Sequence, residues 1–364
     1  MSSTDVSRTP VTYADLPHWA EDDHAAAFAA FFVSARRLLE RAREGATPES
    51  PEALLRVARI AVDGCPQIET SNDARAFFEA HFVPHRVMHG EPQGLLTGYY
   101  EPVIPGSRTQ TERFTVPVLK RPADLVNVVS ESERGAKAEA FTHLRKTATG
   151  TEPYATREEI EEGALAGQGL EFVWLEDPVD AFFLHVQGSG MIAFADGTTA
   201  RITYDGKNGH PYTSVGRYLI DAGLFPAEQM SLDALKDWLK ANGARGIAAM
   251  RQNRSYVFFR ELTGEAAGSA LGAMEIPLSD HRSLAVDTRY HALGTPVYVV
   301  SPELTHAGRD DGFYQLMVAQ DVGSAIRGPE RGDIYFGTGV EAGAKAGCTK
   351  HPGNFFVLVP DDVP

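Results

Sequence analysis

Three aspartates lie at the ends of short apolar runs, each of which predicts a buried β-strand. Asp287 and Asp321 end such runs, and Asp333 opens another. Residues 322–332 contain glycines and a proline, so the chain must turn there. Carboxyl groups give and take protons, and neighbouring glycines leave room for a ligand to approach the backbone. The three aspartates therefore form a hypothesis for a site. The alternative, favoured for any one of them on spacing alone, is that they cap turns.

The stretch 94–102 carries hydroxyl groups and flat rings beside two glycines. Thr97, Tyr99 and Tyr100 supply them. Flat rings with polar rims suit sugar rings, which present C–H faces and hydroxyl edges. The alternative is a β-strand with one buried tyrosine, so this stretch does not establish a sugar site by itself.

The apolar run 182–186 predicts a strand that is followed by a glycine-rich turn. His185 and Gln187 would share one face of this strand, and the turn at Gly188 and Ser189 would expose the serine hydroxyl. The serine is not in the G-x-S-x-G arrangement of a hydrolase nucleophile, because Gln187 stands in place of the first glycine. We therefore interpret the stretch as a rim of hydrogen-bonding groups.

A polar turn, 205–212, leads into a predicted helix at 213–222. Its Asn208 and Tyr212 carry groups that can donate hydrogen bonds to a ligand. The alternative is that Asn208 and the glycine after it only turn the chain.

Three histidines, His81, His85 and His89, recur every four residues, a spacing that aligns metal ligands on a helix. Pro84 lies inside this run and should break such a helix. The sequence therefore favours histidines on a surface or at the edge of a groove. We expect no metal site and no cofactor.

Size and composition restrict the classes of function. A chain of 364 residues should form about two domains, and its hydrophobic content of 43% is ordinary for a folded protein. The net charge of −15 argues against a nucleic-acid partner. No apolar run approaches the ~18 residues of a membrane helix, and the sequence as written shows no signal peptide and no lipobox cysteine. Whether Cys65 and Cys348 pair is open.

Helical periodicity predicts an N-terminal helical layer, with helices at 22–44, 51–62 and 72–82. From about residue 105, short β runs alternate with turns, a pattern typical of a small barrel. The C-terminal third contains further β runs and all three aspartates.

Five separated motifs, in the right order, resemble the membrane-bound lytic murein transglycosylase A family. They are Thr97–Tyr100, Pro153–Arg157, Gln187–Gly190, Gly206–Tyr212 and the segment Ala319–Tyr335. The resemblance extends from about Gly94 to the C-terminus. Its last segment is similar to the three-aspartate domain, with Asp287, Asp321 and Asp333 at the named positions.

The resemblance implies a mainly β fold with an N-terminal helical layer (α+β). A double-psi β-barrel domain would comprise residues 1–103 and 246–364. A smaller β-barrel domain, residues 104–245, would be inserted in it, and a groove between the two would hold a glycan strand.

The resemblance also implies cleavage without water of the β-1,4 bond between N-acetylmuramic acid and N-acetylglucosamine in peptidoglycan, giving 1,6-anhydromuramyl products. Asp333 would act first as general acid and then as base, supported by Asp321 and Asp287. The groups lining the substrate groove would be Thr97, Tyr100, Gln187, Gly188, Ser189, Asn208 and Tyr212.

The expected partner is therefore a peptidoglycan strand. We expect the protein to be a monomer in the periplasm, and association with the outer membrane is open. Two other functions remain to be separated from this one. The first is a muramidase-type hydrolase that uses Asp333, Asp321 and a water, and the second is a non-catalytic glycan-binding β-barrel protein. Acid protease chemistry would require the two aspartates to lie close together as a catalytic pair.

Overall fold

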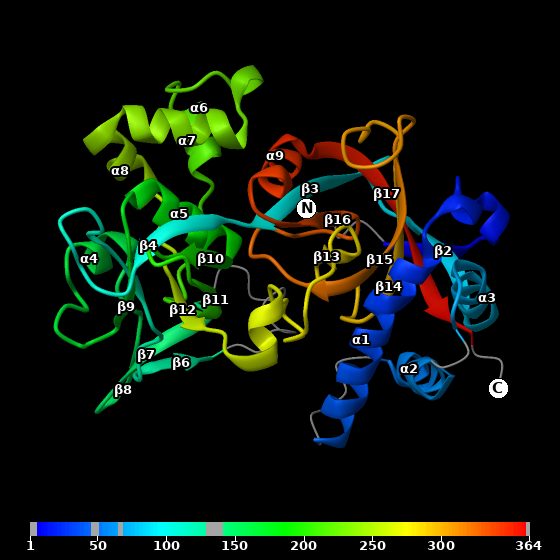
Figure 1. Cartoon of the computed structure of the whole chain (residues 1–364). Coiled ribbons are helices and arrows are strands. Elements are labelled where there is room, and N and C mark those ends of the chain that lie inside the picture. Colours follow the sequence, from blue (N-terminus) through cyan, green and yellow to red (C-terminus); the bar gives the residue numbers. More distant parts are fainter. Residues whose placement is uncertain (1–5, 45–50, 65–67, 129–140, 362–364) are drawn as a thin grey trace. The chain divides into compact units, whose positions relative to one another are not determined.

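The computed structural model describes residues 6–44, 51–64, 68–128 and 141–361 (Figure 1). The chain divides into two compact units. The first unit comprises Met1–Tyr99, Leu271–Gly337 and Thr349–Pro364, and the second comprises Tyr100–Ala270 and Thr338–Cys348. Cys65 lies outside the described residues, and Cys348 is an exposed free thiol. The fold is of the mixed α+β class, as predicted.

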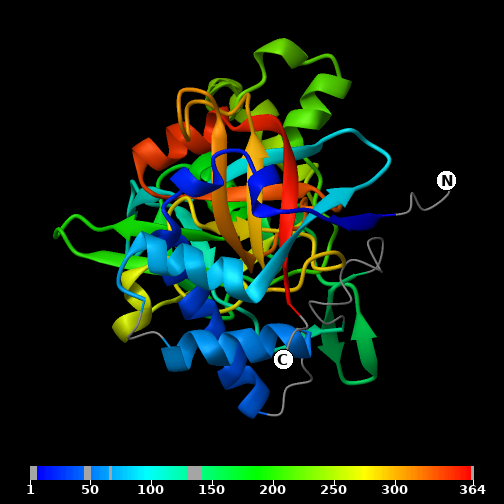
Figure 2. The same ribbon diagram turned by 90° about the vertical axis from the view of Figure 1, so that its right-hand side faces the viewer.

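The first unit begins with the predicted helical layer. Its helices are α1 (His24–Arg43), α2 (Glu52–Gly64) and α3 (Ser71–His81), which confirms the three predicted helices. Asp23 caps α1, since its side chain accepts a hydrogen bond from the backbone N–H of Ala26. Figures 1 and 2 show the three helices gathered beside the strands of the unit. Apolar side chains of α1, α2 and α3 form one core cluster with residues of the strands, including Tyr298 and Leu316.

The strands of the first unit are β1 (Ser7–Pro10), β2 (Phe82–Met88), β3 (Gly94–Glu101), β13 (Ser283–Ala285), β14 (Pro296–Ser301), β15 (Phe313–Asp321), β16 (Arg331–Thr338) and β17 (Lys350–Pro360). They form a sheet in the order β1-β2-β17-β14-β15-β13-β16-β3, and β3 also pairs with β17. Six strands, from β17 through β14, β15, β13 and β16 to β3, therefore close into a ring. Closure brings residues that are distant in the sequence onto neighbouring strands, because every strand of the ring has two partners.

The second unit contains a six-stranded sheet in the order β12-β11-β10-β4-β9-β5. Its strands are β4 (Val103–Ser107), β5 (Val116–Leu119), β9 (Glu171–Leu175), β10 (Ser189–Ala193), β11 (Thr199–Lys207) and β12 (Val257–Glu261). The two edge strands, β5 and β12, lie close to each other. A smaller sheet contains β6 (Leu125–Asn127), β7 (His143–Thr147) and β8 (Gly150–Glu152).

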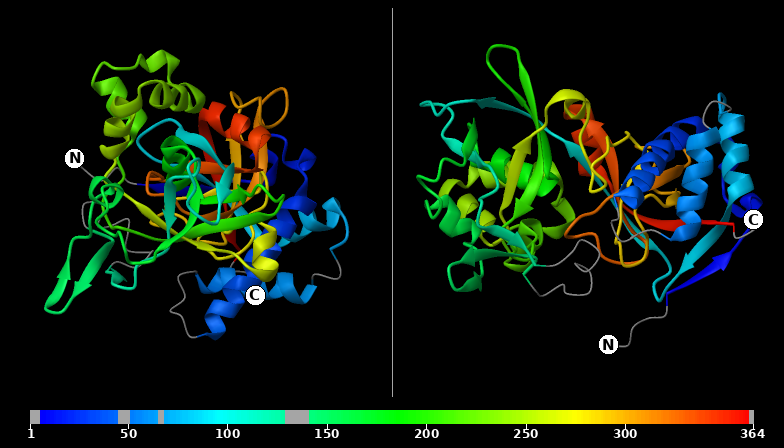
Figure 3. Two further views of the ribbon diagram at one scale, coloured as in Figure 1. Left: turned by 60° about the vertical axis from the view of Figure 1, so that its left-hand side comes forward. Right: turned by 90° about the horizontal axis from the view of Figure 1, so that it is seen from below.

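The helices of the second unit are α4 (Arg157–Glu161), α5 (Pro178–Gln187), α6 (Val215–Asp221), α7 (Leu232–Ala241), α8 (Gly243–Arg251) and α9 (Val340–Cys348). In the left-hand view of Figure 3, the yellow-green helices α7 and α8 lie together, in agreement with their contacts. No helix among the described residues combines the length and the apolar character needed to cross a membrane.

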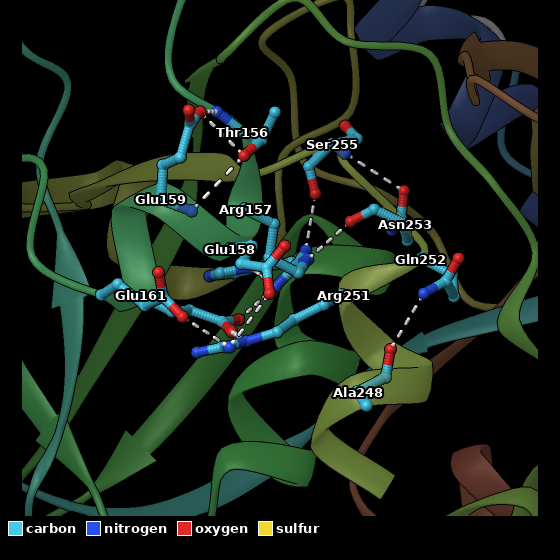
Figure 4. Close-up of polar contacts among 12 residues, drawn as sticks. Thr156, Arg157, Glu158, Glu159, Glu161, Ala248, Arg251, Gln252, Asn253 and Ser255 are labelled. Carbon is cyan, nitrogen blue, oxygen red and sulfur yellow. Dashed lines mark hydrogen bonds and ion pairs between the residues drawn. The ribbon is translucent and has the colours of Figure 1, made fainter. Parts of the chain in front are cut away.

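A polar junction fixes α4 to the segment that precedes β12 (Figure 4). The Arg157 side chain is fully buried and donates to the backbone carbonyls of Asn253 (3.0 Å) and Ser255 (2.7 Å). Its Nη1 also lies 3.1 Å from Nδ1 of His185 on α5. Burial and the Arg157 charge hold the pKa of His185 well below its usual value, so His185 is neutral and accepts this hydrogen bond.

The predicted strand at 182–186 is wrong, because these residues lie in helix α5. Asp177 caps the helix by accepting from the backbone N–H of Val179 (2.8 Å), and Pro178 occupies the first turn. Gly188 ends it in the left-handed conformation, with φ of 77°. A short apolar run does not distinguish a buried strand from a buried helix, and here the flanking caps decide between the two.

The unit boundaries also differ from the predicted domain boundaries at 103/104 and 245/246. They fall at 99/100 and 270/271, and residues 338–348 join the second unit. The pairing of strands and the packing of helices explain these boundaries. Strand β12 pairs with β11 of the second unit, and α9 contacts α7.

Candidate active site

Strand β3 brings Asp321 and Asp333 into one polar cluster. The Thr97 hydroxyl donates to Oδ1 of Asp333, and the Tyr99 hydroxyl donates to Oδ2 of Asp321 at 2.9 Å. Thr97 and Tyr99 point to the same face of β3, because side chains alternate along a strand. One strand therefore supplies a donor to each of the two carboxyl groups.

Asp321 accepts three hydrogen bonds. Its Oδ1 accepts from the backbone N–H groups of Ala273 and Val322, each at 2.9 Å, in addition to the Tyr99 contact at Oδ2. Burial raises the pKa of Asp321 to about 6, and the nearby charge of Asp333 acts in the same direction. The three hydrogen bonds oppose this shift, because they favour the ionised form.

Asp333 is partly buried and has a different environment. In the part of the chain that the structure describes, Thr97 is the hydrogen-bond donor found at its carboxyl group. Arg331, on the same face of β16, donates to the Thr97 hydroxyl oxygen at 2.8 Å. Burial raises the pKa of Asp333, while the Arg331 charge and the Thr97 hydrogen bond lower it, and burial dominates.

The Tyr99 hydroxyl stays protonated over the working pH range. Burial, followed by the charge of Asp321, raises its pKa well above the usual value for tyrosine. Its ring also lies beside that of Tyr335 on β16, with 5.2 Å between the ring centroids. Tyr99 therefore acts as a fixed donor to Asp321.

Asp287 follows β13 and is completely buried. It pairs with Arg289 (2.5 Å between Oδ2 and Nη2) and accepts from the backbone N–H of Gly328 (2.8 Å). Burial raises its pKa, but the bonds from Arg289 and Gly328 outweigh burial, so the pKa lies below the usual range. Asp287 is thus an ionised anchor for the segment between β15 and β16.

Several residues predicted to bind substrate lie in the second unit. Gln187 ends α5, and its Oε1 accepts from the backbone N–H of Tyr100 at 3.1 Å. The Tyr100 side chain is buried, and its hydroxyl accepts from Lys236 at 3.1 Å. Ser189 is also buried, in β10, which corrects the expectation that a turn exposes its hydroxyl.

Asn208 has a structural position. It is completely buried, and its amide donates to the carbonyls of Ala155 and Arg254, each at 2.8 Å. Its Oδ1 accepts from the backbone N–H of Tyr256 at 2.9 Å. Asn208 therefore ties the segment before α4 to the segment before β12. Tyr212 is partly buried in the same unit.

The site residues predicted from the sequence do not include Tyr99, Ala273 and Arg331. Tyr99 and Arg331 had a detectable signal, since each lies two positions from a predicted site residue and so shares its strand face. Ala273 acts through its backbone N–H, which leaves no mark on side-chain type.

The three regularly spaced histidines do not share a helix. His81 ends α3, and His85 lies in β2, so the chain leaves the helix before Pro84, as expected from the missing N–H of proline. His89 Nε2 lies 2.8 Å from Oε2 of the buried Glu330. Within the described ranges, no group of three or more His, Cys, Asp or Glu residues is arranged to hold a metal ion.

Between about pH 4 and pH 7, the Asp321→Asn variant should lose less stability than the wild type as the pH rises. The folded-state pKa of Asp321, about 6, lies above the ordinary value of 3.8. Its contribution to stability is therefore complete below about pH 4 and is lost as the pH rises through about 6. The loss amounts to at most about 3 kcal/mol.

Urea unfolding at pH 4, 5, 6 and 7 measures this difference between variant and wild type. Asp287→Asn is the matched control with the opposite sign. The pKa of Asp287 is lowered, so its contribution is present at neutral pH and is lost as the pH falls. If the unfolding free energies of Asp321→Asn and wild type depended on pH in the same way, the raised pKa of Asp321 would be contradicted.

Asn208→Ala should destabilise the protein by about 2–5 kcal/mol, because it leaves two carbonyls and one N–H buried without their partner. The midpoint of urea unfolding measures the effect. Tyr212→Phe, which keeps the ring and removes one hydroxyl, is the control and should cost less. An Asn208→Ala variant of wild-type stability would show that the side chain is free for a ligand.

Two family models match the chain. The family model described as the MltA specific insert domain matches residues 95–260, and that of the 3D domain matches residues 282–359. The membrane-bound lytic murein transglycosylase A of Vibrio cholerae is 35% identical over 281 residues, which covers 76% of this chain and 68% of the relative.

Two crystal structures extend the comparison. That of a membrane-bound lytic murein transglycosylase from Agrobacterium tumefaciens has a TM-score of 0.86 and 34% identity, and covers 97% of this chain and 98% of its own. That of MltA from Escherichia coli with bound chitohexaose has a TM-score of 0.68 and 26% identity, with 99% and 95% covered. The chain therefore belongs to the membrane-bound lytic murein transglycosylase A family.

Proposed function

We propose that this protein is a lytic transglycosylase of peptidoglycan. It cleaves the β-1,4 bond between N-acetylmuramic acid and N-acetylglucosamine and forms a 1,6-anhydro ring on the muramyl sugar. The observation that carries the proposal is the Asp333 carboxyl group. It is partly buried, its pKa is raised, and Thr97 fixes its orientation, in a chain whose relatives are named for this activity.

The reaction requires one group that is an acid and then a base. Protonated Asp333 gives its proton to the glycosidic oxygen, and the bond to the muramyl C-1 breaks. The Asp333 carboxylate then takes the proton of the C-6 hydroxyl, whose oxygen closes on C-1. Each cycle returns the proton to Asp333. Attack from within the same sugar also removes most of the entropic cost of bringing in a nucleophile.

The environments of the two carboxyl groups favour Asp333 for this role. Both oxygens of Asp321 already accept hydrogen bonds, so its proton-accepting positions face protein donors. Asp333 is partly buried, as Asp321 is, but among the described residues its carboxyl group has a donor at Oδ1 alone, from Thr97. Arg331 stabilises the carboxylate that remains after the first proton transfer. Asp321, whose own pKa the charge of Asp333 raises, is the supporting carboxyl group, and Asp287 anchors the backbone beyond the site.

The residues predicted to bind substrate differ in their exposure to solvent. Gln187, Gly188 and Tyr212 are partly exposed and are proposed to contact the glycan. Thr97 acts on Asp333. Tyr100, Ser189 and Asn208 are buried, which favours the structural alternative for them. The bound chitohexaose of the Escherichia coli relative supports a sugar chain as the ligand.

We further propose that the closed ring of the first unit is a double-psi barrel, into which the second unit is inserted as a smaller domain. The parallel pairing of β13 with β15, beside the antiparallel pairing of β14 with β15, supports this topology. We also propose that the protein works as a monomer without a cofactor. The name of the family supports a periplasmic position associated with the outer membrane.

A muramidase-type hydrolase is the second candidate, because Asp321 and Asp333 are electrostatically coupled and could act as a carboxylate pair. Mass spectrometry of the soluble products separates the two reactions. A hydrolase releases a reducing sugar that is heavier than the anhydro product by one water. Release of reducing ends alone would overturn the transglycosylase assignment.

Asp333→Asn should reduce turnover of peptidoglycan sacculi by about 10²- to 10⁴-fold, because the amide cannot transfer the proton. Fold and binding should persist, as measured by circular dichroism and by co-sedimentation with sacculi. The control is Asp311→Asn, which changes an exposed aspartate of the same unit. Substantial release of anhydromuropeptides by Asp333→Asn would exclude Asp333 as the acid.

Turnover should also decline as the pH rises through the raised pKa of Asp333, since the first step needs its protonated form. Asp321→Asn should change the pH of this decline little, because burial, and not the charge of Asp321, raises the pKa of Asp333. The pH profile of kcat, taken with wild type and variant on the same sacculi, measures both. A decline that moves to clearly lower pH in the variant would contradict burial as the cause of the raised pKa of Asp333.

A further inference from the structure

A buried ion pair of the second unit lies outside every motif used so far. Glu101 is completely inaccessible to solvent and Arg201 is 8% exposed. Nε of Arg201 lies 2.8 and 3.0 Å from the two oxygens of Glu101. Burying two charges costs several kcal/mol per ion, so a buried pair is weak evidence for stability alone. A second role for the pair therefore has to be considered.

The pair gathers three separate segments of the chain. Glu101 is the last residue of β3. Thr338, the last residue of β16, donates to Oε2 of Glu101 at 2.7 Å, and the N–H of Gly339 donates to the Glu101 carbonyl at 2.9 Å. Nη1 of Arg201 donates to the carbonyl of Ala267 at 2.6 Å. β3, β16 and the segment at 267 are thus fixed at one point.

Each of these three segments also carries a group of the carboxylate site. β3 carries Thr97 and Tyr99, and β16 carries Asp333. The segment at 267 continues to Ala273, whose N–H donates to Asp321. One face of β3 also carries Thr97, Tyr99 and Glu101, which are two residues apart. A shift of Glu101 along the strand therefore shifts both hydroxyl donors with it.

We propose that Arg201 and Glu101 are positioning residues for the proposed reaction. They hold the last residues of β3 and β16 and the 267–273 segment at one point, and thereby adjust the geometry of Thr97 and Asp333. Arginine suits this role because its planar fork binds both carboxylate oxygens and a carbonyl at once, whereas lysine offers a single point charge. The inference rests on the proposed function.

Arg201→Lys tests the proposal, because it keeps the charge and removes the fork. We expect kcat on sacculi to fall about 10- to 100-fold, since small misplacements of catalytic groups have effects of this size. KM should change less than about threefold, and the decline of kcat with pH should move. Arg108→Lys is the matched control, because Arg108 forms a two-point pair with Glu261 at the exposed surface of the same unit.

A second readout does not depend on turnover. The pKa of Asp333, measured by ¹³C NMR of aspartate-labelled protein and assigned with Asp333→Asn, should shift in Arg201→Lys and stay constant in Arg108→Lys. If Arg201→Lys does not fold, Glu101→Gln, which keeps the shape and one acceptor oxygen, takes its place in every measurement.

A lower unfolding midpoint with unchanged kcat, pH profile and Asp333 pKa would overturn the proposal and leave the pair a structural role only. A rise in KM at constant kcat would overturn it as well. Failure of the proposed function is distinguishable, since it would appear as the absence of anhydromuropeptides with wild-type enzyme, while the NMR comparison would still stand.

Discussion

The site depends on the cost of holding two carboxyl groups near each other in a partly desolvated place. Like charges at short range and loss of water both disfavour ionisation, so each group needs a donor. Strand β3 meets this need with Thr97 for Asp333 and Tyr99 for Asp321. Because the two donors share one strand face, the positions of the two carboxyl groups are fixed relative to each other by a single element.

A closed ring of strands is what lets β3 perform this role. β3 comes from the N-terminal part of the chain, and it pairs with β16 and β17 from the C-terminal part. Pairing on both sides fixes its register, and a slip by one residue would turn Thr97 and Tyr99 away from the carboxyl groups. The helices α1, α2 and α3 contribute by burying their apolar faces against the ring, and Arg41 of α1 also donates to the carbonyl of Ala273.

Sequence patterns predicted the helical layer, most of the strands and the two aspartates of the site, because periodicity and turn residues report on local structure. They failed where a local pattern is ambiguous or where contacts are distant. The run 182–186 fits a strand or a helix, and only the caps at Asp177 and Gly188 separate the two. Asn208 has the residue type of a ligand contact, yet its amide binds three backbone groups that come from elsewhere in the chain. No local pattern encodes that arrangement.

The opposed influences on Asp333 match what the proposed reaction needs from one group. An acid that must return as a base within the same cycle works best when neither protonation state is strongly preferred. Burial alone would hold the proton too tightly, and the Arg331 charge with the Thr97 hydrogen bond alone would release it too early. Asp287 is an aspartate that releases its proton early, since Arg289 and the Gly328 N–H keep it ionised despite complete burial. The difference between these two aspartates lies in their donors, because Asp287 accepts from the Arg289 side chain and from two backbone N–H groups, whereas among the described residues Thr97 is the donor to Asp333.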